Sequence, residues 1–421
     1  MKRTVALGAL SCLIAFAVPA SAVICDIGVT PAATLLLPYF EVDLNNPTGS
    51  GTLFSVNNSS AMAVLAHVTV WSDLSVPVLD FNIYLTGYDV QTINLSDILV
   101  SGSLPQTASV GQDPSDTISP KGAKSQDVDF PSCTGQLPPP PLPASFIQHL
   151  QLSLTGKASP LFGGLCSGQS LGDNIARGYI TVDTVNKCTL RLPNDPNYFS
   201  QDVTFQNVLW GDYFYINYGQ GLANGGDLVH VEASLTDPAT TTPGRYTFYG
   251  RYVGWNASDH REPLATTFGG RYAIGGGFSG SASYVVWRDS KTIQNAFTCP
   301  ATTGRPAWYP LGQEGIDIFD EQEQVSVPLT SPVSPSGFGI VPFPAEAQRT
   351  QINGPDFPVP FSFGWIFLDL NTTVAGNPNP PFDPGAAQAW MIYDLFAGGT
   401  FSAGFEGLRL DSACAPNHTV P

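Results

Sequence analysis

Residues 244–290 read GRYTFYGRYVGWNASDHREPLATTFGGRYAIGGGFSGSASYVVWRDS, and this stretch decides how we interpret the chain around it. Gly-Arg-Tyr occurs in it three times, beginning at residues 244, 250 and 270. Tyrosine, phenylalanine and valine recur on alternate positions between glycine-rich breaks, which is typical of successive antiparallel strands. We therefore predict two hairpins, with Gly275-Gly276-Gly277 as the turn between the last two strands, because glycine adopts positive φ at little cost.

Five arginines are concentrated in the same stretch, although only 12% of the chain is charged. An arginine beside a tyrosine on a strand can stack on the ring or fork onto a carboxylate. One interpretation is a cross-strand ladder of structural ion pairs with the acidic residues of the stretch. The other is a cluster that binds an anion or a uronate, with Arg261, Arg271 and Arg288 as its donors.

The composition of the chain favours an all-β fold. Its 421 residues include 42 glycines and 37 prolines, so turns are frequent and helix-forming residues are scarce. The length is sufficient for two domains with substantial cores. The formal net charge of −17 repels nucleic acid and anionic lipid, and we expect neither as a partner.

Residues 1–22 have the organisation of a secretory signal peptide. Lys2 and Arg3 form a basic start, an apolar segment follows, and Ala20-Ser21-Ala22 supplies a cleavage site of small residues. We expect the mature protein to be secreted or held at the cell surface, with the periplasm as the alternative. After cleavage we find no apolar run long enough to cross a bilayer as a helix.

The cysteines predict a disulfide framework. One of the seven, Cys12, lies in the signal segment, and an even number in an exported chain indicates three disulfides with fifteen possible connectivities. We predict a pair between Cys166 and Cys188, because these residues flank one short strand unit. No spacing typical of a zinc site occurs. The six remaining cysteines are Cys25, Cys133, Cys166, Cys188, Cys299 and Cys414.

Residues 23–104 are predicted to form a first β-sandwich. Its expected strands are 34–42, 51–57, 62–72, 78–85 and 90–95, separated by turns rich in Asn, Pro, Gly and Asp. The succession VNNSS, AVLAHVTVWSD and VQTINL resembles the immunoglobulin-like modules of bacterial surfaces. This resemblance implies an immunoglobulin-like β-sandwich and no particular activity.

Residues 105–144 are predicted to be a Pro- and Ser-rich linker, since residues 138–143 read PPPPLP and favour an extended conformation. A helix is expected over 145–154, capped by Ser145 and ended by Gly156. Residues 145–421 then form a larger antiparallel β-sandwich domain, with a hairpin joining 389–396 to 401–410 and a surface loop at 329–339. Whether 145–421 is one domain or two is left open.

A second resemblance covers most of this larger domain. REPLATTFGGRYA, SYVVWRDSK and GYITVDTVNKC resemble segments of secreted bacterial proteins that have no assigned function. The resemblance therefore implies export, and it carries over no catalytic or binding residue.

Two groups of residues are candidates for catalysis. Asp317, Asp320, Glu321 and Glu323 form the densest acidic cluster, and paired carboxylates of this kind perform acid and base catalysis in glycosidases. A solvated acidic loop is the alternative. Cys166 has the spacing of a nucleophile elbow, but the even cysteine count favours a disulfide.

Two further groups are candidates for binding. Tyr213 and Tyr215 share one face of a strand and could stack on a sugar ring, although such aromatic strands are commonly core. Asn224 and Asp227, in the segment NGGD, offer oxygen ligands for calcium, with an Asx turn as the alternative. Apart from possible calcium, we expect no cofactor.

The sequence contains no Walker A or HExxH motif. We therefore hypothesise a non-catalytic extracellular or cell-surface protein that acts in structure, adhesion or glycan binding. The alternatives are a secreted carbohydrate-active hydrolase that uses the carboxylates of 317–323, and a self-associating subunit of an extracellular filament. The partners that we expect are a glycan or another surface protein.

Overall fold

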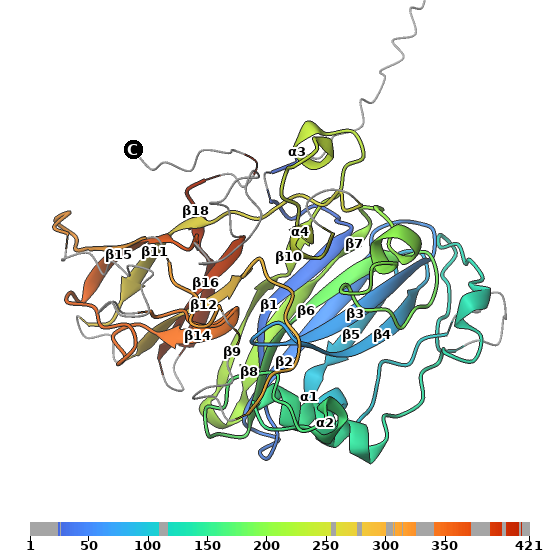
Figure 1. Cartoon of the computed structure of the whole chain (residues 1–421), viewed down its shortest axis with the longest axis horizontal. Helices are drawn as coiled ribbons and strands as arrows, with labels where there is room; N and C mark the ends of the chain where they lie inside the picture. The colour runs from blue at the N-terminus through green and yellow to red at the C-terminus, as the bar shows by residue number, and fades with distance from the viewer. Residues whose placement is uncertain are drawn as a thin grey trace, which may run out of the picture.

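The computed structural model describes residues 24–25, 27–108, 117–253, 258–275, 280–299, 306, 308–313, 315–325, 341–371, 388–397, 401–411 and 414 (Figure 1). The predicted signal segment 1–22, two of the three glycines of the predicted 275–277 turn, and the predicted loop 329–339 lie outside these residues.

The described chain is an all-β protein built from four antiparallel sheets, as the sequence predicts. Two sheets form a first sandwich and two form a second. The strands of the first are β1 (Thr34–Asp43), β2 (Ser50–Asn58), β3 (Val64–Ser72), β4 (Pro77–Leu85), β5 (Val90–Asn94), β6 (Ile175–Val185), β7 (Leu209–Trp210), β8 (Asp212–Asn217), β9 (Leu222–Asp227) and β10 (Val229–Val231). Those of the second are β11 (Thr267–Ala273), β12 (Ser281–Arg288), β13 (Gly315–Phe319), β14 (Ala347–Gln351), β15 (Phe363–Asp369), β16 (Ala389–Ala397), β17 (Phe401–Glu406) and β18 (Leu408–Arg409).

Helices are short and lie between the sheets and around their edges. They are α1 (Leu95–Leu99), α2 (Ala144–Leu154), α3 (Pro238–Thr241) and α4 (Gly250–Val253), with single turns η1 (Pro131–Cys133), η2 (Pro160–Phe162), η3 (Tyr198–Asp202) and η4 (Tyr218–Gln220). Among the described residues, none of these helices has the length and hydrophobicity that a membrane span requires.

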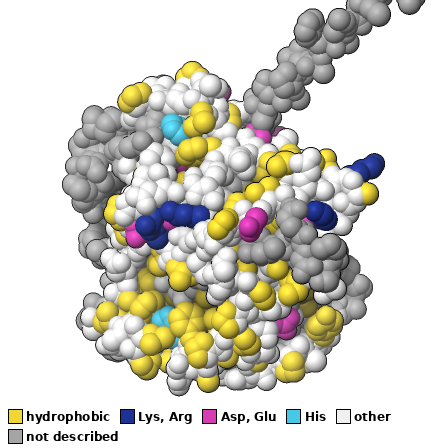
Figure 2. All heavy atoms as spheres, turned by 90° about the vertical axis from the view of Figure 1, so that its right-hand side faces the viewer, with side chains coloured by type: hydrophobic (Ala, Val, Ile, Leu, Met, Phe, Trp, Pro, Cys, Tyr) yellow, Lys and Arg dark blue, Asp and Glu magenta, His cyan; other side chains and the backbone are white. Residues whose placement is uncertain are grey.

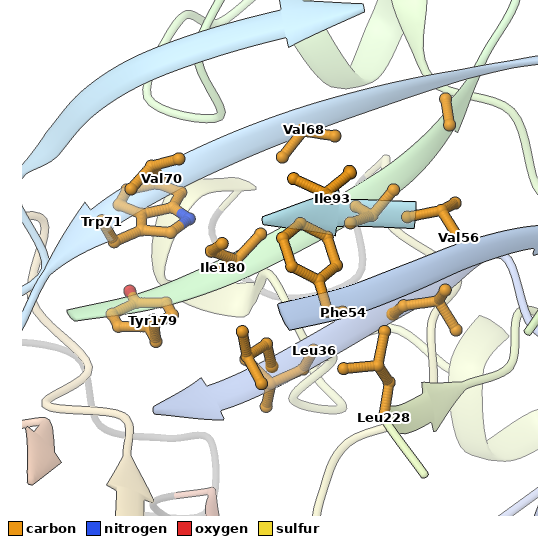
Figure 3. Close-up of a cluster of buried hydrophobic side chains, with 14 of the residues drawn as sticks. Leu36, Phe54, Val56, Val68, Val70, Trp71, Ile93, Tyr179, Ile180 and Leu228 are labelled. Atoms are coloured by element: carbon orange, nitrogen blue, oxygen red, sulfur yellow. The ribbon is translucent and has the colours of Figure 1, made fainter. Parts of the chain in front are cut away.

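The first sandwich packs the sheet β10-β1-β6-β3-β4 against the sheet β5-β2-β8-β9. Phe54 of β2 and Ile93 of β5 point from one sheet toward Leu36 of β1 and Ile180 of β6 in the other (Figure 3). All four side chains are at most 2% exposed. Burying one such side chain contributes roughly 1.5–3 kcal/mol, so this cluster is a main source of stability.

The sheets divide the chain differently from the predicted boundary near residues 104–145. The strands expected within 32–100 are present, but β1 pairs with β6 and β10, and β2 pairs with β8. The first sandwich therefore extends to Val231 and contains strands from both sides of the predicted linker. Alternating hydrophobicity locates a strand and its buried face, whereas it does not identify the strand's partner.

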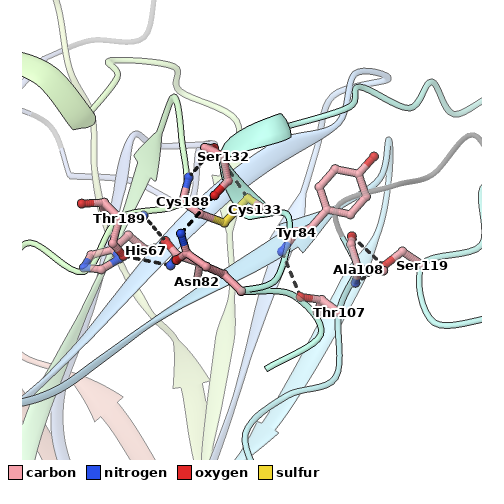
Figure 4. The surroundings of a disulfide bond; sticks show 11 residues. His67, Asn82, Tyr84, Thr107, Ala108, Ser119, Ser132, Cys133, Cys188 and Thr189 are labelled. Atoms are coloured by element: carbon pink, nitrogen blue, oxygen red, sulfur yellow. Dashed lines mark hydrogen bonds between the residues drawn. A yellow bond between two sulfur atoms is a disulfide. The ribbon is translucent and has the colours of Figure 1, made fainter. Parts of the chain in front are cut away.

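The predicted linker is packed along the edge strand β4 rather than acting as a spacer. Thr107 accepts a hydrogen bond from the Tyr84 amide at 3.2 Å, and Cys133 forms a disulfide with Cys188 beside the same strand (Figure 4). The covering segment shields a strand edge that would otherwise be open to pairing with another chain.

The predicted helix is confirmed as α2, with differences at its start and in its location. Pro143, not Ser145, is the N-cap residue and makes no side-chain capping bond, while Gly156 follows the helix with φ +67° as expected. Leu150 and Leu154 are buried in the core of the first sandwich. The helix therefore belongs to the first sandwich, not to the second domain.

The second sandwich packs the sheet β13-β15-β11-β18 against the sheet β14-β12-β16-β17. The predicted hairpin of β16 and β17 is confirmed by their antiparallel pairing. The predicted hairpin between β11 and β12 is wrong, because the two strands lie in different sheets. Tyr272 of β11 and Tyr284 of β12 are both buried in the core between these two sheets.

The first hairpin predicted within residues 244–290 is also absent. Residues 250–253 form α4, and the segment before β11 lies on the outer face of the first sandwich. Tyr249 donates to the Asp183 carboxylate at 2.8 Å, and the Tyr252 ring lies 5.8 Å from that of Trp71. Burial of these rings against β3 and β6 replaces the cross-strand pairing that their alternation favours.

A buried ionic cluster joins the two sandwiches. Arg251 lies 3.2 Å from Asp289 and 2.9 Å from Glu346, and all three side chains are at most 4% exposed. Ser75, which follows β3, donates to Glu346, which precedes β14. Val285, Trp287 and other residues of the second sandwich belong to the hydrophobic core of the first. The described residues of the 244–290 stretch therefore connect the two sandwiches.

On the side of the first sandwich turned away from the second, charged side chains are few (Figure 2). The visible basic side chains lie in separate groups across the middle of this view, with acidic ones near some of them, and hydrophobic side chains gather below.

Candidate functional site

Arg261 is part of the interior. Its guanidinium lies 3.1 Å from Asp259 and 3.5 Å from Asp183, and all three side chains are fully buried. Thr34 accepts a further hydrogen bond from its Nε. This environment matches the structural ion pair that the sequence offers as one interpretation, and it leaves the guanidinium inaccessible to a ligand.

Arg288 is also buried, with no exposed surface. Its guanidinium donates to the main-chain carbonyls of Phe343 at 3.0 Å, Leu370 at 2.8 Å and Leu311 at 3.3 Å. Burial lowers the pKa of this arginine. Arg288 therefore ties three loops to β12, and the three arginines predicted to form one anion-binding cluster have separate environments.

Arg271 is exposed and differs from every other arginine that the structure describes. The others donate to a carboxylate or a main-chain carbonyl, whereas the Arg271 guanidinium makes no hydrogen bond or ion pair with any described residue. Ion pairing and carbonyl contacts explain why the other arginines are present. Within the described part of the chain, Arg271 has no such contact.

The strand register places Arg271 in a row with two aromatic residues. Trp365 of β15 pairs with Arg271 of β11 on one side and with Phe319 of β13 on the other. The indole of Trp365 is stacked on the Phe319 ring with centroids 4.4 Å apart, and it remains 40% exposed. Directly paired residues share a face of the sheet, so the row lies on the outer face of the second sandwich.

This row borders a cleft of about 540 Å³, which we call the Trp365 cleft. Three of the four acidic residues predicted as catalytic candidates line it together with Arg271. Its lining residues are Arg271, Tyr272, Ala273, Asp320, Glu321, Glu323, Phe363, Gly364 and Trp365. The structure thus brings together one predicted arginine and three predicted carboxylates, which the sequence placed about fifty residues apart.

The acidic residues of the Trp365 cleft have different roles. Asp320 accepts hydrogen bonds from the amides of Gln322 and Gln324, both at 2.8 Å, so one of its oxygens holds the loop after β13. Glu323 has φ +64° in this loop. Asp317 lies on β13 two residues before Phe319 and is not among the residues that line the cleft.

Burial raises the pKa of Tyr272 to about 12. Its hydroxyl is therefore protonated at neutral pH. The Tyr272 side chain is 1% exposed, so the cleft offers one guanidinium and three carboxylates beside an exposed indole.

Tyr213 and Tyr215 do not form an open stacking surface. They are 4% and 2% exposed, and the Tyr215 hydroxyl donates to the carbonyl of Tyr39 at 2.8 Å. The core interpretation is thus the correct one for both rings. Tyr215 additionally lines a second pocket, between the sandwiches.

Asn224 and Asp227 lie on β9, not on a turn. The Asn224 amide donates to Asp394 at 2.6 Å. Among the residues that the structure describes, no cluster of three or more His, Cys, Asp or Glu side chains could hold a metal ion. The predicted Asx turn is replaced by pairing of β9 with β8.

All six cysteines predicted to pair do so, with one error in connectivity. The disulfides are Cys25–Cys414, Cys133–Cys188 and Cys166–Cys299. The predicted Cys166–Cys188 pair is wrong. Cys166 lies beside the segment that contains Cys299, and Cys188 lies beside the segment that contains Cys133. Disulfide bonding of Cys166 also removes it as a nucleophile.

No protein-family model matches the chain. No curated protein matches it. Among solved structures, the partial N-terminal region of an enterococcal surface protein aligns at 7% identity over 90% of this chain and 96% of that chain, with a TM-score of 0.17. A similarity at this level supports no inference about fold or function.

Trp365 is the site residue that sequence reasoning missed. It lies in β15, whose two alternating sets of residues are both hydrophobic: Phe363, Trp365 and Phe367 on one face, and Ile366 and Leu368 on the other. The alternation therefore did not show which face is exposed. The acidic residues Asp320, Glu321 and Glu323, which line the same cleft, were the part of the site that the sequence did indicate.

Proposed function

We propose that this chain is a non-catalytic, exported β-sandwich protein that binds a neutral glycan in the Trp365 cleft. The observation that carries the proposal is the row of Phe319, Trp365 and Arg271 across three strands, with an exposed indole and a guanidinium that has no partner among the described residues. A rigid sheet holds these groups in fixed positions, which lowers the entropic cost of binding.

The chemistry of a sugar ring matches this arrangement. A pyranose has an apolar face of C–H groups that packs on an aromatic ring, and a rim of hydroxyls that both donate and accept hydrogen bonds. In the Trp365 cleft, the indole supplies the apolar surface, Arg271 supplies donors, and Glu321 and Glu323 supply acceptors. The volume of about 540 Å³ lies within the range of ligand sites, ~300–1,000 Å³.

The charges favour a neutral glycan over a uronate. Three carboxylates and one guanidinium line the cleft, so its formal charge is negative, and the whole chain carries −17. An acidic sugar would be repelled both on approach and in the bound state. The uronate interpretation required three arginines in one place, and two of them are buried.

The disulfides support an extracellular or periplasmic location. Three disulfides join segments separated by 389, 55 and 133 residues, and such bonds persist in oxidising compartments. Export by a cleaved signal peptide at residues 1–22 is part of this proposal. Retention of the glycan-binding chain at a cell surface would make it an adhesin.

The test compares two tryptophans of equal exposure. Trp365 is 40% exposed and Trp210 of β7 is 39% exposed, but only Trp365 lies in the cleft. The mature chain is screened on an array of neutral and acidic glycans, and Trp365→Ala and Trp210→Ala are then measured on the best neutral glycan. We expect Trp365→Ala to bind at least about tenfold more weakly, which is ~1.4 kcal/mol, and Trp210→Ala to bind as the wild type does.

The alternative for the same cleft is a carbohydrate-active hydrolase, which Asp320, Glu321 and Glu323 favour by their position beside Trp365. A hydrolase predicts release of reducing ends from the bound glycan, and loss of that release in Glu321→Gln or Glu323→Gln. Binding without release supports the non-catalytic assignment. Release that either substitution abolishes would replace it with the hydrolase.

A further inference from the structure

A second pocket, of about 260 Å³, lies at the junction of the two sandwiches. One wall is formed by Tyr215 of β8 and Asn224 of β9 in the first sandwich. The opposite wall is the face of the β14-β12-β16-β17 sheet that carries Ser281, Ser283, Arg349 and Asp394. We call this site the seam pocket. It is separate from the Trp365 cleft, with which it shares no lining residue.

The strand register aligns polar side chains along the sheet wall. Gln351, Ser283 and Asp394 pair directly across β14, β12 and β16, so they form one row on one face. Arg349 is two residues before Gln351 on the same face. Central strands of a sandwich commonly carry apolar residues on a covered face, and a polar row at this position is unexplained by packing.

Several of these polar groups have no hydrogen bond within the described chain. No described residue bonds the hydroxyls of Ser281 and Ser283 or the side-chain amide of Gln351. The Nε of Arg349 is buried without an acceptor among the described residues. An unpaired buried donor costs about 1–3 kcal/mol, which applies to the Arg349 Nε. Ser281 and Ser283 are half-buried and Gln351 is exposed, so their polar groups are open to a polar ligand in the pocket.

The charged groups of the seam pocket compensate one another. Arg349 lies 3.0 Å from Glu41 and 3.2 Å from Asp394, and its guanidinium rests on the ring of Tyr215 at 5.0 Å. Asn224 donates to the other oxygen of Asp394. One cation between two carboxylates offers no net attraction for an anion. The remaining free groups are neutral donors and acceptors, which match hydroxyls.

We propose that the seam pocket binds a single neutral, polyhydroxylated ring, the size of one monosaccharide, between the two sandwiches. Its volume of about 260 Å³ is below the ~300–1,000 Å³ typical of larger ligands, which fits one sugar ring. The ligand would contact both sandwiches and so stabilise their junction. This proposal does not depend on glycan binding in the Trp365 cleft.

The experiment measures the melting temperature of the mature chain with neutral hexoses, N-acetylhexosamines, lysine and inorganic phosphate at millimolar concentrations. A ligand that binds only the folded state raises the melting temperature. We expect at least one neutral sugar to raise it, and Ser283→Leu, which fills the pocket, to abolish that shift. The measurement is made in the Trp365→Ala background, so that the Trp365 cleft adds no shift of its own, and Ser200→Ala, an exposed serine outside the pocket, should keep the shift in that background.

Folding of Ser283→Leu is checked by circular dichroism, and Ser283→Ala provides a milder variant in which the apparent affinity should fall at least about threefold. The proposal is overturned if no neutral sugar raises the melting temperature, or if only lysine or phosphate does. It is equally overturned if, in the Trp365→Ala background, no shift remains or the shift survives Ser283→Leu, because the sugar would then bind elsewhere.

Discussion

Replacing Arg261 with methionine should destabilise the fold far more than the same replacement of Arg271, although both arginines come from one stretch of sequence. The Arg261 side chain is fully buried between Asp183 and Asp259, which are fully buried too. Methionine fills similar space without the charge, so two carboxylates lose their cation. Removing one partner of a buried ion pair costs about 3–5 kcal/mol.

The hydrogen bonds that remain on Asp183 place the expected loss near the lower end of that range. Thr34, Tyr198 and Tyr249 still donate to its carboxylate, at 2.5, 2.7 and 2.8 Å. Arg271 is exposed and has no ion pair with a described residue, so Arg271→Met should change the free energy of unfolding by no more than about 0.5 kcal/mol.

The assay is urea unfolding at pH 7 with the disulfides intact, followed by tryptophan fluorescence, for the wild type and both variants. A double variant, Arg261→Met with Asp183→Asn, should recover part of the loss because it also removes one unpaired charge. Equal free energies for Arg261→Met and Arg271→Met would refute the assignment of Arg261 to a buried structural cluster.

Two further predictions concern the disulfides and pH. Replacing Cys133 and Cys188 together by serine opens a loop of 55 residues and should lower the free energy of unfolding by about 4 kcal/mol in the chain-entropy model, measured by urea unfolding; a loss below about 1 kcal/mol would contradict it. Burial raises the pKa of Glu262 to about 8, whereas the unfolded value is about 4.3. The folded state keeps this proton at pH values where the unfolded chain has already released it. The free energy of unfolding of the wild type should therefore fall relative to that of Glu262→Gln as the pH rises from about 5 to 8, by on the order of 1 kcal/mol per pH unit. If the difference between the two free energies is constant or changes in the opposite direction between pH 5 and 8, Glu262 is not a buried, protonated carboxyl group.

The positions of the early strands could be predicted from the sequence, but their partners could not. The five strands expected between residues 34 and 95 match β1 to β5 closely, because turn residues and alternating hydrophobic residues mark each one. The pairing of β1 with β6 brings together residues about 140 positions apart. Nothing in the local pattern specifies such a contact, and the predicted boundary failed for this reason.

The arginines show why the site was only partly predictable. Arg271 lies between Gly270 and Tyr272, Arg288 follows Trp287, and Arg261 lies between a histidine and a glutamate, and none of these local sequences shows whether its arginine is buried. Tertiary packing buries the first and third and exposes the second. The position of Arg271 on an outer face depends on β11 and β12 entering different sheets, which the glycine-rich connection between them does not reveal.

The disulfide pairing was mispredicted for the same reason, because it depends on tertiary packing. The even number of cysteines correctly indicated that all six pair, whereas proximity in sequence favoured Cys166–Cys188. In the fold, Cys166 meets Cys299 through the bridge between Cys166 and Phe297, and Cys188 meets Cys133 in the segment that covers β4. Both pairs depend on segments whose path over the sheets is not encoded locally.

The most direct measurement of the central claim is the dissociation constant of a neutral oligosaccharide for the mature chain and its Trp365→Ala, Arg271→Ala and Trp210→Ala variants, by isothermal titration calorimetry. The account predicts measurable binding by the wild type and by Trp210→Ala, with affinity at least about tenfold weaker in Trp365→Ala and reduced in Arg271→Ala. Equal affinity in all four proteins would contradict a glycan site at the Trp365 cleft, and so would the absence of binding by the wild type.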